Sequence, residues 1–152
     1  MKFSVNQQDL QKSLNYCQGV IEKRSTLPIL SNVLLEVSNA NLTITATDLD
    51  LIFIHKIPNV EISEEGKTTS SSSIMYDIVR KFSSGSKINF SNPSENKLHL
   101  ESDKSVFNLN CINASEFPLT EENFNENEFS IKSKKLLKLL NKCKFSVSND
   151  ET

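Results

Sequence analysis

The chain has 152 residues, of which 37% are hydrophobic and 24% are charged, and its formal net charge is -2. This composition is ordinary for a folded globular protein, and nothing in it indicates a fibrous or intrinsically disordered class. The apolar runs, such as residues 49–54, are short and interrupted by acids, and the N-terminus lacks a signal-peptide pattern. We therefore expect a cytoplasmic protein without a membrane segment.

The cysteines and histidines do not form a recognisable site. Cys17, Cys111 and Cys143 are odd in number, widely spaced and without a C-x-x-C motif. This spacing disfavours a disulfide framework or a zinc site and predicts reduced, mostly structural thiols. His55 and His99 lie in alternating, strand-like patterns and are too few for a histidine-rich metal centre. We expect no metal and no cofactor.

In chain order, the first predicted unit is a strand followed by an amphipathic helix. Residues 1–5 alternate, Asn6 is a capping residue, and apolar residues then recur at helical spacing, namely Leu10, Leu14, Cys17 and Ile21. Apart from Asp9, the other side of this helix is polar and free of acids; it carries Gln8, Gln11, Lys12, Asn15 and Gln18. Such a face can approach phosphate without repelling it.

The middle of the chain changes to a period of two. Candidate strands at residues 32–37, 42–47 and 51–57 predict an antiparallel meander. Residues 66–73 are rich in capping residues and predict a polar entry to a second helix. The apolar stripe of that helix is Ile74, Met75, Ile78, Val79 and Phe82, and its outer face carries Tyr76, Asp77, Arg80 and Lys81.

The region after the second helix repeats the plan of the first half. Strands are predicted at residues 87–90, 97–101 and 105–112, with turns at 92–93 and 102–103. Residues 1–112 thus consist of two halves, each with a strand, a helix and a set of antiparallel strands.

A longer repeat relates the two ends of the chain. The segment FSVNQQDLQKSLNYC, from Phe3, recurs as FSIKSKKLLKLLNKC, from Phe129, at an offset of 126 residues (129 minus 3). This offset is the length of a small domain. We therefore expect one domain at residues 1–125 and the truncated start of a second domain at residues 126–152.

Charge is segregated around this boundary. Residues 116–128 contain five acids and no base, and six lysines then follow between residues 132 and 144 without an acid. The pattern fits either a solvated linker followed by a lysine-rich surface helix or a helix that faces a polyanion.

Five strings of residues resemble one known family. They are KRSTLPILSNVLLE from Lys23, LTITATDLDL from Leu42, GKTTSSSSIMYDIVRKF from Gly66, FNLNCINASEFP from Phe107 and FSVSNDET from Phe145. In order and spacing they resemble the first domain, and the start of the second, of the bacterial sliding clamp, the beta subunit of DNA polymerase III. The resemblance implies an α+β DNA clamp fold, with antiparallel sheets on the outside and two amphipathic helices per domain on the inner face.

The resemblance also implies a function. Members of this family are non-catalytic processivity factors, associated with DNA-directed DNA polymerase activity, whose three-domain protomers form a head-to-tail homodimeric ring around double-stranded DNA. Weak, sequence-independent phosphate contacts suit sliding, because base contacts would hold the protein in one register. The polymerase and the clamp loader are expected to bind through regions that are missing here, and no membrane partner is expected.

The resemblance assigns DNA-binding residues. Arg24 matches a DNA-contacting arginine, with a weak loop pair to Glu22 as the alternative. Arg80, Lys81 and, more weakly, Lys12 are expected to be cations of the inner surface. For Arg80 and Lys81, the favourable position of cations at a helix C-terminus is an equally good explanation.

Two further DNA-binding assignments depart from the family pattern. Many relatives have basic residues at positions 73 and 74, so we expect a weaker phosphate contact at Ser73. Asp150 falls where some relatives carry a neutral polar contact, and its carboxylate is expected to repel phosphate.

The dimer interface is assigned to Phe107, Leu109, Ile74 and Lys104. Phe107 and Leu109 alternate onto one side of the predicted closing strand. They either pack against the third domain of a partner protomer or belong to an ordinary core. In the first case, an edge strand and apolar side chains are exposed in the absence of the partner.

Two other functions fit the sequence less well. A hydrolase could use Asp48, Asp50 and His55, but the aspartates bracket a turn, and no nucleophile or glycine-rich phosphate loop lies near them in the sequence. A small module that binds nucleic acid directly would need basic and aromatic residues together. Only Tyr16 and Tyr76 are candidates for exposed stacking.

Overall fold

The computed structural model describes residues 1–21, 27–119 and 130–147 of the chain. Its contacts divide the chain into two compact units, Met1–Leu119 and Thr120–Thr152. Among the described residues, all strands belong to the first unit. The predicted domain boundary at residues 125–126 lies outside the described residues and stays a prediction.

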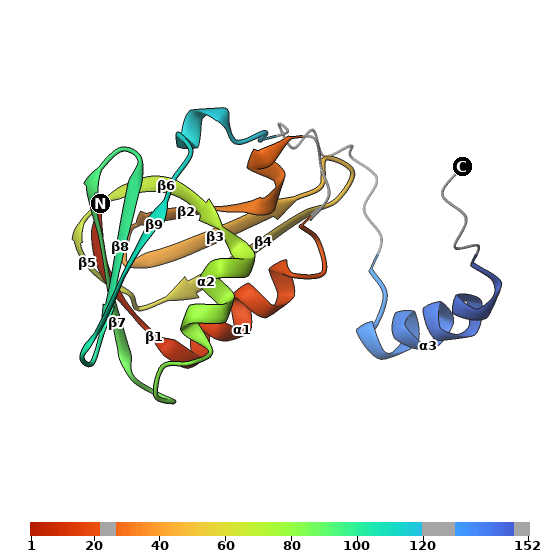
Figure 1. The fold of residues 1–152 in the computed structure, drawn as a ribbon. Helices are drawn as coiled ribbons and strands as arrows, with labels where there is room; N and C mark the ends of the chain where they lie inside the picture. The colour runs from red at the N-terminus through yellow and green to blue at the C-terminus, as the bar shows by residue number, and fades with distance from the viewer. Residues whose placement is uncertain (22–26, 120–129, 148–152) are drawn as a thin grey trace. The chain divides into compact units, whose positions relative to one another are not determined.

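Two antiparallel sheets form the first unit (Figure 1). One has the strand order β5-β1-β7-β8-β9 and the other the order β4-β3-β2-β6. The strands are β1 (Lys2–Asn6), β2 (Asn32–Ser38), β3 (Asn41–Thr47), β4 (Ile52–Pro58), β5 (Glu61–Glu64), β6 (Gly66–Ser71), β7 (Lys87–Ser94), β8 (Lys97–Ser102) and β9 (Ser105–Asn110). The α+β class and the predicted meander, β2-β3-β4, are confirmed.

Each half of the first unit contributes its leading strand to the sheet of the other half. β1, which precedes helix α1 (Gln7–Cys17), pairs with β7 of the second half. β6, which precedes helix α2 (Ser72–Val79), pairs with β2 of the first half. The two predicted halves are therefore present, but they cannot separate without breaking two strand ladders.

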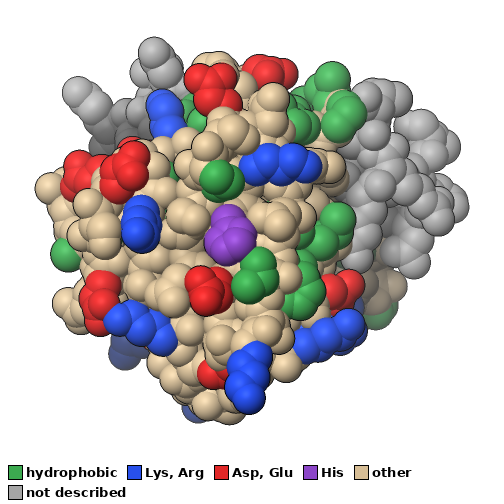
Figure 2. All heavy atoms as spheres, turned by 60° about the vertical axis from the view of Figure 1, so that its left-hand side comes forward, with side chains coloured by type: hydrophobic (Ala, Val, Ile, Leu, Met, Phe, Trp, Pro, Cys, Tyr) green, Lys and Arg blue, Asp and Glu red, His purple; other side chains and the backbone are tan. Residues whose placement is uncertain are grey.

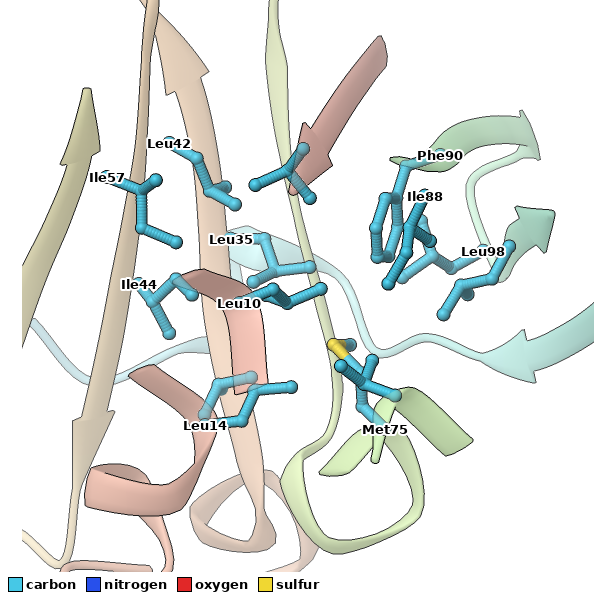
Figure 3. Close-up of a cluster of buried hydrophobic side chains, with 14 of the residues drawn as sticks. Leu10, Leu14, Leu35, Leu42, Ile44, Ile57, Met75, Ile88, Phe90 and Leu98 are labelled. Atoms are coloured by element: carbon cyan, nitrogen blue, oxygen red, sulfur yellow. The ribbon is translucent and has the colours of Figure 1, made fainter. Parts of the chain in front are cut away.

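The core of the unit is enclosed by the two sheets and the two helices (Figure 3). Leu10 and Leu14 of α1 and Met75 of α2 are fully buried, together with strand residues such as Leu35 and Phe90. The apolar side chains that recur at helical spacing and those that alternate along the strands thus pack into one cluster.

Helix α1 begins where the sequence predicts but ends earlier. The side chain of Asn6 accepts a hydrogen bond from Gln8 N at 2.9 Å, which confirms the predicted cap. The helix ends at Cys17, and Ile21 is buried in the turn that follows. The predicted stripe therefore reaches the core, although its last member is not helical.

Helix α2 is also shorter than its apolar stripe. It ends at Val79, before Phe82. Ile74 is 53% exposed, so its assignment to the buried stripe was wrong. A helix of eight residues has a narrow buried face, and Met75 and Val79 fill it.

Residues 66–71 form strand β6, so the prediction of a polar entry was wrong. The hydroxyl groups in this strand have partners in the core: Thr69 Oγ1 donates to the carbonyl of Ile112 at 2.7 Å, and Ser70 Oγ donates to the carbonyl of Asn110 at 3.2 Å. Small hydroxyl side chains can be buried when they are hydrogen-bonded in this way. Of the capping residues in this strand, Ser71 alone caps a helix, namely α2.

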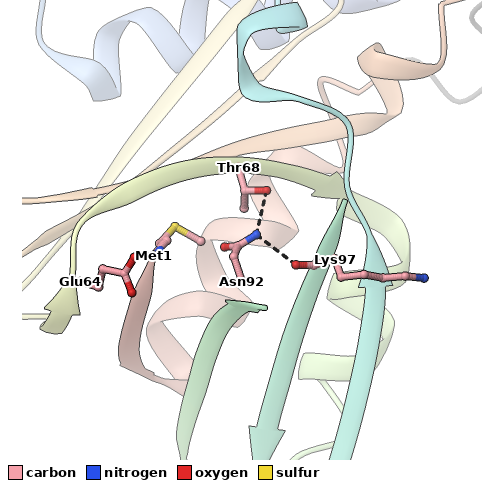
Figure 4. A network of polar contacts seen from close by, with 5 residues as sticks. All are labelled: Met1, Glu64, Thr68, Asn92 and Lys97. Carbon is pink, nitrogen blue, oxygen red and sulfur yellow. Dashed lines mark hydrogen bonds and ion pairs between the residues drawn. The ribbon is translucent and has the colours of Figure 1, made fainter. Parts of the chain in front are cut away.

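The predicted turn at residues 92–93 was also wrong. β7 continues to Ser94, and its ladder with β8 changes register between Ser91 and Ser94. At this irregularity Asn92 Nδ2 donates to Thr68 Oγ1 at 3.3 Å and to the carbonyl of Lys97 at 3.1 Å (Figure 4). The side chain thereby connects the two sheets, and the chain reverses at residues 95–96.

Helix α3 (Ser133–Cys143) belongs to the second unit and follows the predicted pattern. Of the strand predicted before it, the described residues 130–132 are not in a strand. The described residues also form three short 3-10 helices: Pro28–Ser31, Ala114–Glu116 and Lys144–Ser146. Among the described residues, no helix combines the length and apolarity needed to cross a bilayer.

Candidate nucleic-acid interface

Helices α1 and α2 lie side by side and antiparallel (Figure 1). At one end Gln7 Nε2 donates to the carbonyl of Val79 at 2.9 Å, and at the other end Gln18 Nε2 donates to Ser72 Oγ at 2.9 Å. Gln7 is 2% exposed, so the first bond is shielded from water. These two amides fix the helices relative to each other.

The two helices present one surface, which we call the helical surface. It consists of the exposed residues Gln8, Asp9, Lys12, Asn15, Tyr16, Ile74, Asp77, Arg80 and Lys81. Lysine, arginine and amide side chains dominate it, and two acids are present. Of the polar face that the sequence predicts for α1, Gln8, Lys12 and Asn15 are exposed, whereas Gln11 and Gln18 are half-buried. Of the predicted outer face of α2, Tyr76 is half-buried against the core and the other residues are exposed.

Three cations of the helical surface were predicted to meet DNA: Lys12, Arg80 and Lys81. Within the described residues, Lys12 and Lys81 make no ion pair. Arg80 Nε lies 3.1 Å from Asp77 Oδ1, and the guanidinium is 5.9 Å from the centre of the Tyr76 ring. Of the three, Lys12 lies on α1, whereas Arg80 caps the C-terminal end of α2 and Lys81 lies in the turn that follows, so the prediction that both belong to the second helix was wrong. All three are exposed, and Lys12 and Lys81 are free to meet a phosphate.

Ser73 lies in the first turn of α2 and is half-buried. Its hydroxyl donates to Gln18 Oε1 at 3.2 Å, so it helps to join the two helices. This contact gives Ser73 a structural role, and its predicted contact with DNA stays a prediction.

Two of the predicted DNA-binding residues cannot be placed. Arg24, its alternative partner Glu22, and Asp150 lie outside the described residues. Their assignments stay predictions.

The side of the unit that carries β7, β8 and β9 is turned toward the viewer in Figure 2. Acidic and basic side chains are interspersed over this face of the described residues, without one continuous cationic patch. His99, on β8, has its Nδ1 atom 2.9 Å from Asn108 Oδ1, which confirms it as a strand-surface residue. This face therefore lacks the clustered positive charge that would attract a polyanion.

Strand β9 forms one edge of the five-stranded sheet. On it, Phe107 is 36% exposed and packs its ring 5.8 Å from that of Phe82, whereas Leu109 is 8% exposed and belongs to the core. Of the two alternatives, ordinary core packing therefore applies to Leu109. Phe107 lies at the surface, where a partner could reach it.

The other two predicted interface residues are exposed. Ile74 and Leu109 line one shallow pocket, which also includes Cys111. Lys104 lies in the turn between β8 and β9. The surface assignment of Ile74 agrees with its exposure, and the dimer interface itself stays a prediction.

The residues of the alternative hydrolase have structural partners. Asp48 Oδ1 accepts hydrogen bonds from Leu51 N at 2.7 Å and from Asp50 N at 3.1 Å, which closes the turn between β3 and β4. His55 Nδ1 lies 2.8 Å from Ser13 Oγ. Within the described residues there is no group of three His, Cys, Asp or Glu that could hold a metal ion. The geometry therefore does not support a catalytic site here.

The cysteines are free thiols, as the sequence predicts. Burial raises the pKa of Cys17 to about 12, and burial also raises the pKa of Cys111. Cys143, on α3, is exposed. The two buried thiols are packing residues.

Sequence reasoning missed the contacts that restrain the site. The sequence places Gln18 on the polar face of α1 and gives no role to Gln7, although both side chains join α1 to α2. The ion pair between Asp77 and Arg80 was not predicted either. The i,i+3 spacing of Asp77 and Arg80 was a usable signal. No local pattern reveals the two glutamines, because their partners are more than fifty residues away.

Comparisons with known proteins agree on one family. The family described as DNA polymerase III beta subunit, N-terminal domain, matches residues 1–121. The beta sliding clamp of Caulobacter vibrioides (strain NA1000 / CB15N) is 32% identical over 153 residues, covering 100% of this chain and 41% of the relative. The beta sliding clamp of Escherichia coli (strain K12) is 32% identical over 151 residues, covering 99% of this chain and 41% of the relative.

Solved structures show the same likeness. Caulobacter crescentus pol III beta has a TM-score of 0.93 and 32% identity, covering 100% of this chain and 40% of that protein. A DnaN sliding clamp from Bartonella birtlesii bound to griselimycin has a TM-score of 0.93 and 34% identity, covering 99% of this chain and 40% of that protein. The chain therefore spans about 41% of the length of the curated relatives it matches.

Proposed function

Because this chain belongs to the family of DNA polymerase III beta subunits and contains their N-terminal domain, we propose that it is part of a DNA sliding clamp. In this role the helical surface faces duplex DNA inside a ring, and the sheets form the outer wall. The protein acts by encircling the duplex and has no catalytic step of its own. It would work in the cytoplasm, where bacterial DNA is replicated.

The charge balance of the helical surface is the observation that carries this proposal. Three cations and two acids leave it weakly positive, and the intervening residues are mostly amides and a tyrosine. Cations attract phosphate independently of base sequence, and the attraction falls as salt rises. A ring with such a lining holds DNA loosely, so that the duplex can slide through it.

The edge strand β9 supports the proposed assembly. It exposes Val106 and Phe107, and Ile74 and Lys104 are also exposed. A second protomer that pairs with this edge would cover apolar surface and satisfy unpaired backbone groups. We propose this edge as the protomer contact of a head-to-tail homodimer, with the polymerase and the clamp loader bound elsewhere on the ring.

The proposal is tested with the clamp that contains this domain, loaded onto nicked circular plasmid. We expect the protein to stay on the circle during gel filtration and to leave once the plasmid is cut, because encirclement depends on topology. Equal retention on linear and circular DNA would mean binding by affinity and would contradict the proposal.

The residues are tested in the same assay. Replacing Lys12, Arg80 and Lys81 by alanine should weaken loading and leave the dimer intact, whereas Phe107→Ala should weaken the dimer. Exchange of these two outcomes would reverse the assignment of the two surfaces.

A further inference from the structure

The guanidinium of Arg80 is held by two neighbours on its own helix. Arg80 caps the end of α2, and its Nε atom lies 3.1 Å from Asp77 Oδ1. The ring of Tyr76 lies 5.9 Å from the guanidinium carbon. Arg80 and Asp77 are 52% and 58% exposed, so both side chains are open to solvent and to a ligand.

Because of this arrangement, a phosphate that binds Arg80 must also come close to the carboxylate of Asp77. A guanidinium has five N–H donors, and the pair with Asp77 engages the one on Nε. A phosphate that binds the remaining donors lies beside the carboxylate of Asp77 and is repelled by it. Lys12 and Lys81 form no ion pair with an acid among the described residues.

We propose that Asp77 limits the phosphate contact of Arg80 and thereby keeps the helical surface weakly binding. The inference rests on the proposed function and adds a residue that regulates the same surface. Asp77 does not touch DNA; it is a positioning residue that acts through Arg80. A contact of intermediate strength suits a ring that must hold a duplex and still move along it.

The expected effect is modest, because an exposed ion pair contributes little free energy. Removing the acid should strengthen binding about two- to fivefold, the range that follows from the contribution of exposed pairs. The gain should shrink as salt is added, because salt screens exposed charges.

The test is a double-mutant cycle on the full 152-residue chain, read by the fluorescence anisotropy of a short fluorescein-labelled duplex at low salt. We expect Asp77→Asn to bind more tightly than the parent chain, Arg80→Ala to bind more weakly, and the gain from Asp77→Asn to vanish in the Arg80→Ala background. Asp77→Ser provides a second variant with the same expectation. Both sites are exposed, so circular dichroism should show an unchanged fold.

Asp9→Asn is the matched control, because Asp9 lies on the same surface and its replacement changes the net charge equally. Any gain it gives should persist in the Arg80→Ala background. If Arg80→Ala weakens binding and Asp77→Asn still gains in that background, Asp77 does not act through Arg80 and the inference is overturned. If Arg80→Ala has no effect at all, the assignment of Arg80 to the DNA surface fails as well.

Discussion

Helices α1 and α3 are two copies of one sequence pattern in different surroundings. At the offset of 126 residues they begin and end at equivalent positions. Leu10 and Leu14 of α1 are fully buried, whereas their equivalents in α3, Leu136 and Leu140, are 43% and 59% exposed. The pattern specifies the helix and its apolar stripe, and the strands packed against the helix decide whether that stripe is buried.

The difference has a physical origin in the neighbours of each helix. α1 packs against β1, β3, β4 and α2. The described part of the second unit, residues 130–147, contains no strand, and no residue of α3 is buried. A single helix of eleven residues is only marginally stable in water. We therefore expect substitutions of the leucines of α1 to destabilise the first unit, and the equivalent substitutions in α3 to have little effect on stability.

The largest expected difference is the reactivity of the equivalent thiols. Cys143 is exposed and should react with Ellman's reagent within seconds to minutes, whereas Cys17 is buried and burial raises its pKa to about 12. At pH 8 only about one Cys17 thiol in ten thousand would be ionised. Access also requires opening of the core, so its rate should be roughly a thousandfold lower or more.

This rate difference is checked by labelling Cys17→Ala and Cys143→Ala variants side by side, with denatured protein as the control for total thiol. Cys111 is buried too and should react slowly in both variants. Rapid labelling of native Cys17 would show that α1 is not held in the core.

The next difference concerns the equivalent leucines. Leu14→Ala should lower the free energy of unfolding by about 2–5 kcal/mol, because it leaves a cavity in a packed core. Leu140→Ala, its matched counterpart, should leave urea unfolding of the first unit unchanged. Unfolding followed by tyrosine fluorescence and by circular dichroism measures both, and similar losses for the two variants would contradict the comparison.

The repeat also shows how far sequence reasoning reaches. Periodicity predicts the strands of the meander and the buried faces of α1 and α2 around Leu10, Leu14 and Met75, because burial and helical spacing are local properties. It misses β6, because the buried hydroxyls of Thr69 and Ser70 find their partners in distant residues.

The candidate site follows the same rule. The exposure of Lys12, Arg80 and Lys81 could be predicted from helical spacing alone, although α2 ends at Val79, before the last two. The antiparallel docking of the two helices through Gln7 depends on a residue far along the chain, and the exchange of β1 and β6 between sheets has no local signal. The features that could not be predicted from the sequence therefore depend mostly on contacts between distant segments of the chain.

The smallest difference lies at the starts of the two helices. Asn6 caps α1 with its side chain, whereas the equivalent Lys132 makes no side-chain cap for α3. Asn6→Ala should therefore cost about 1 kcal/mol in the free energy of unfolding, and Lys132→Ala should cost little. In the reverse direction, Lys132→Asn should raise the helicity of α3. The measurement is the far-UV circular dichroism of a peptide of residues 130–147, and Lys132→Ala is the control for the loss of charge. Equal helicity of the Asn and Ala peptides would mean that α3 gains nothing from a cap, and that the two copies differ at their first turn as well as in their surroundings.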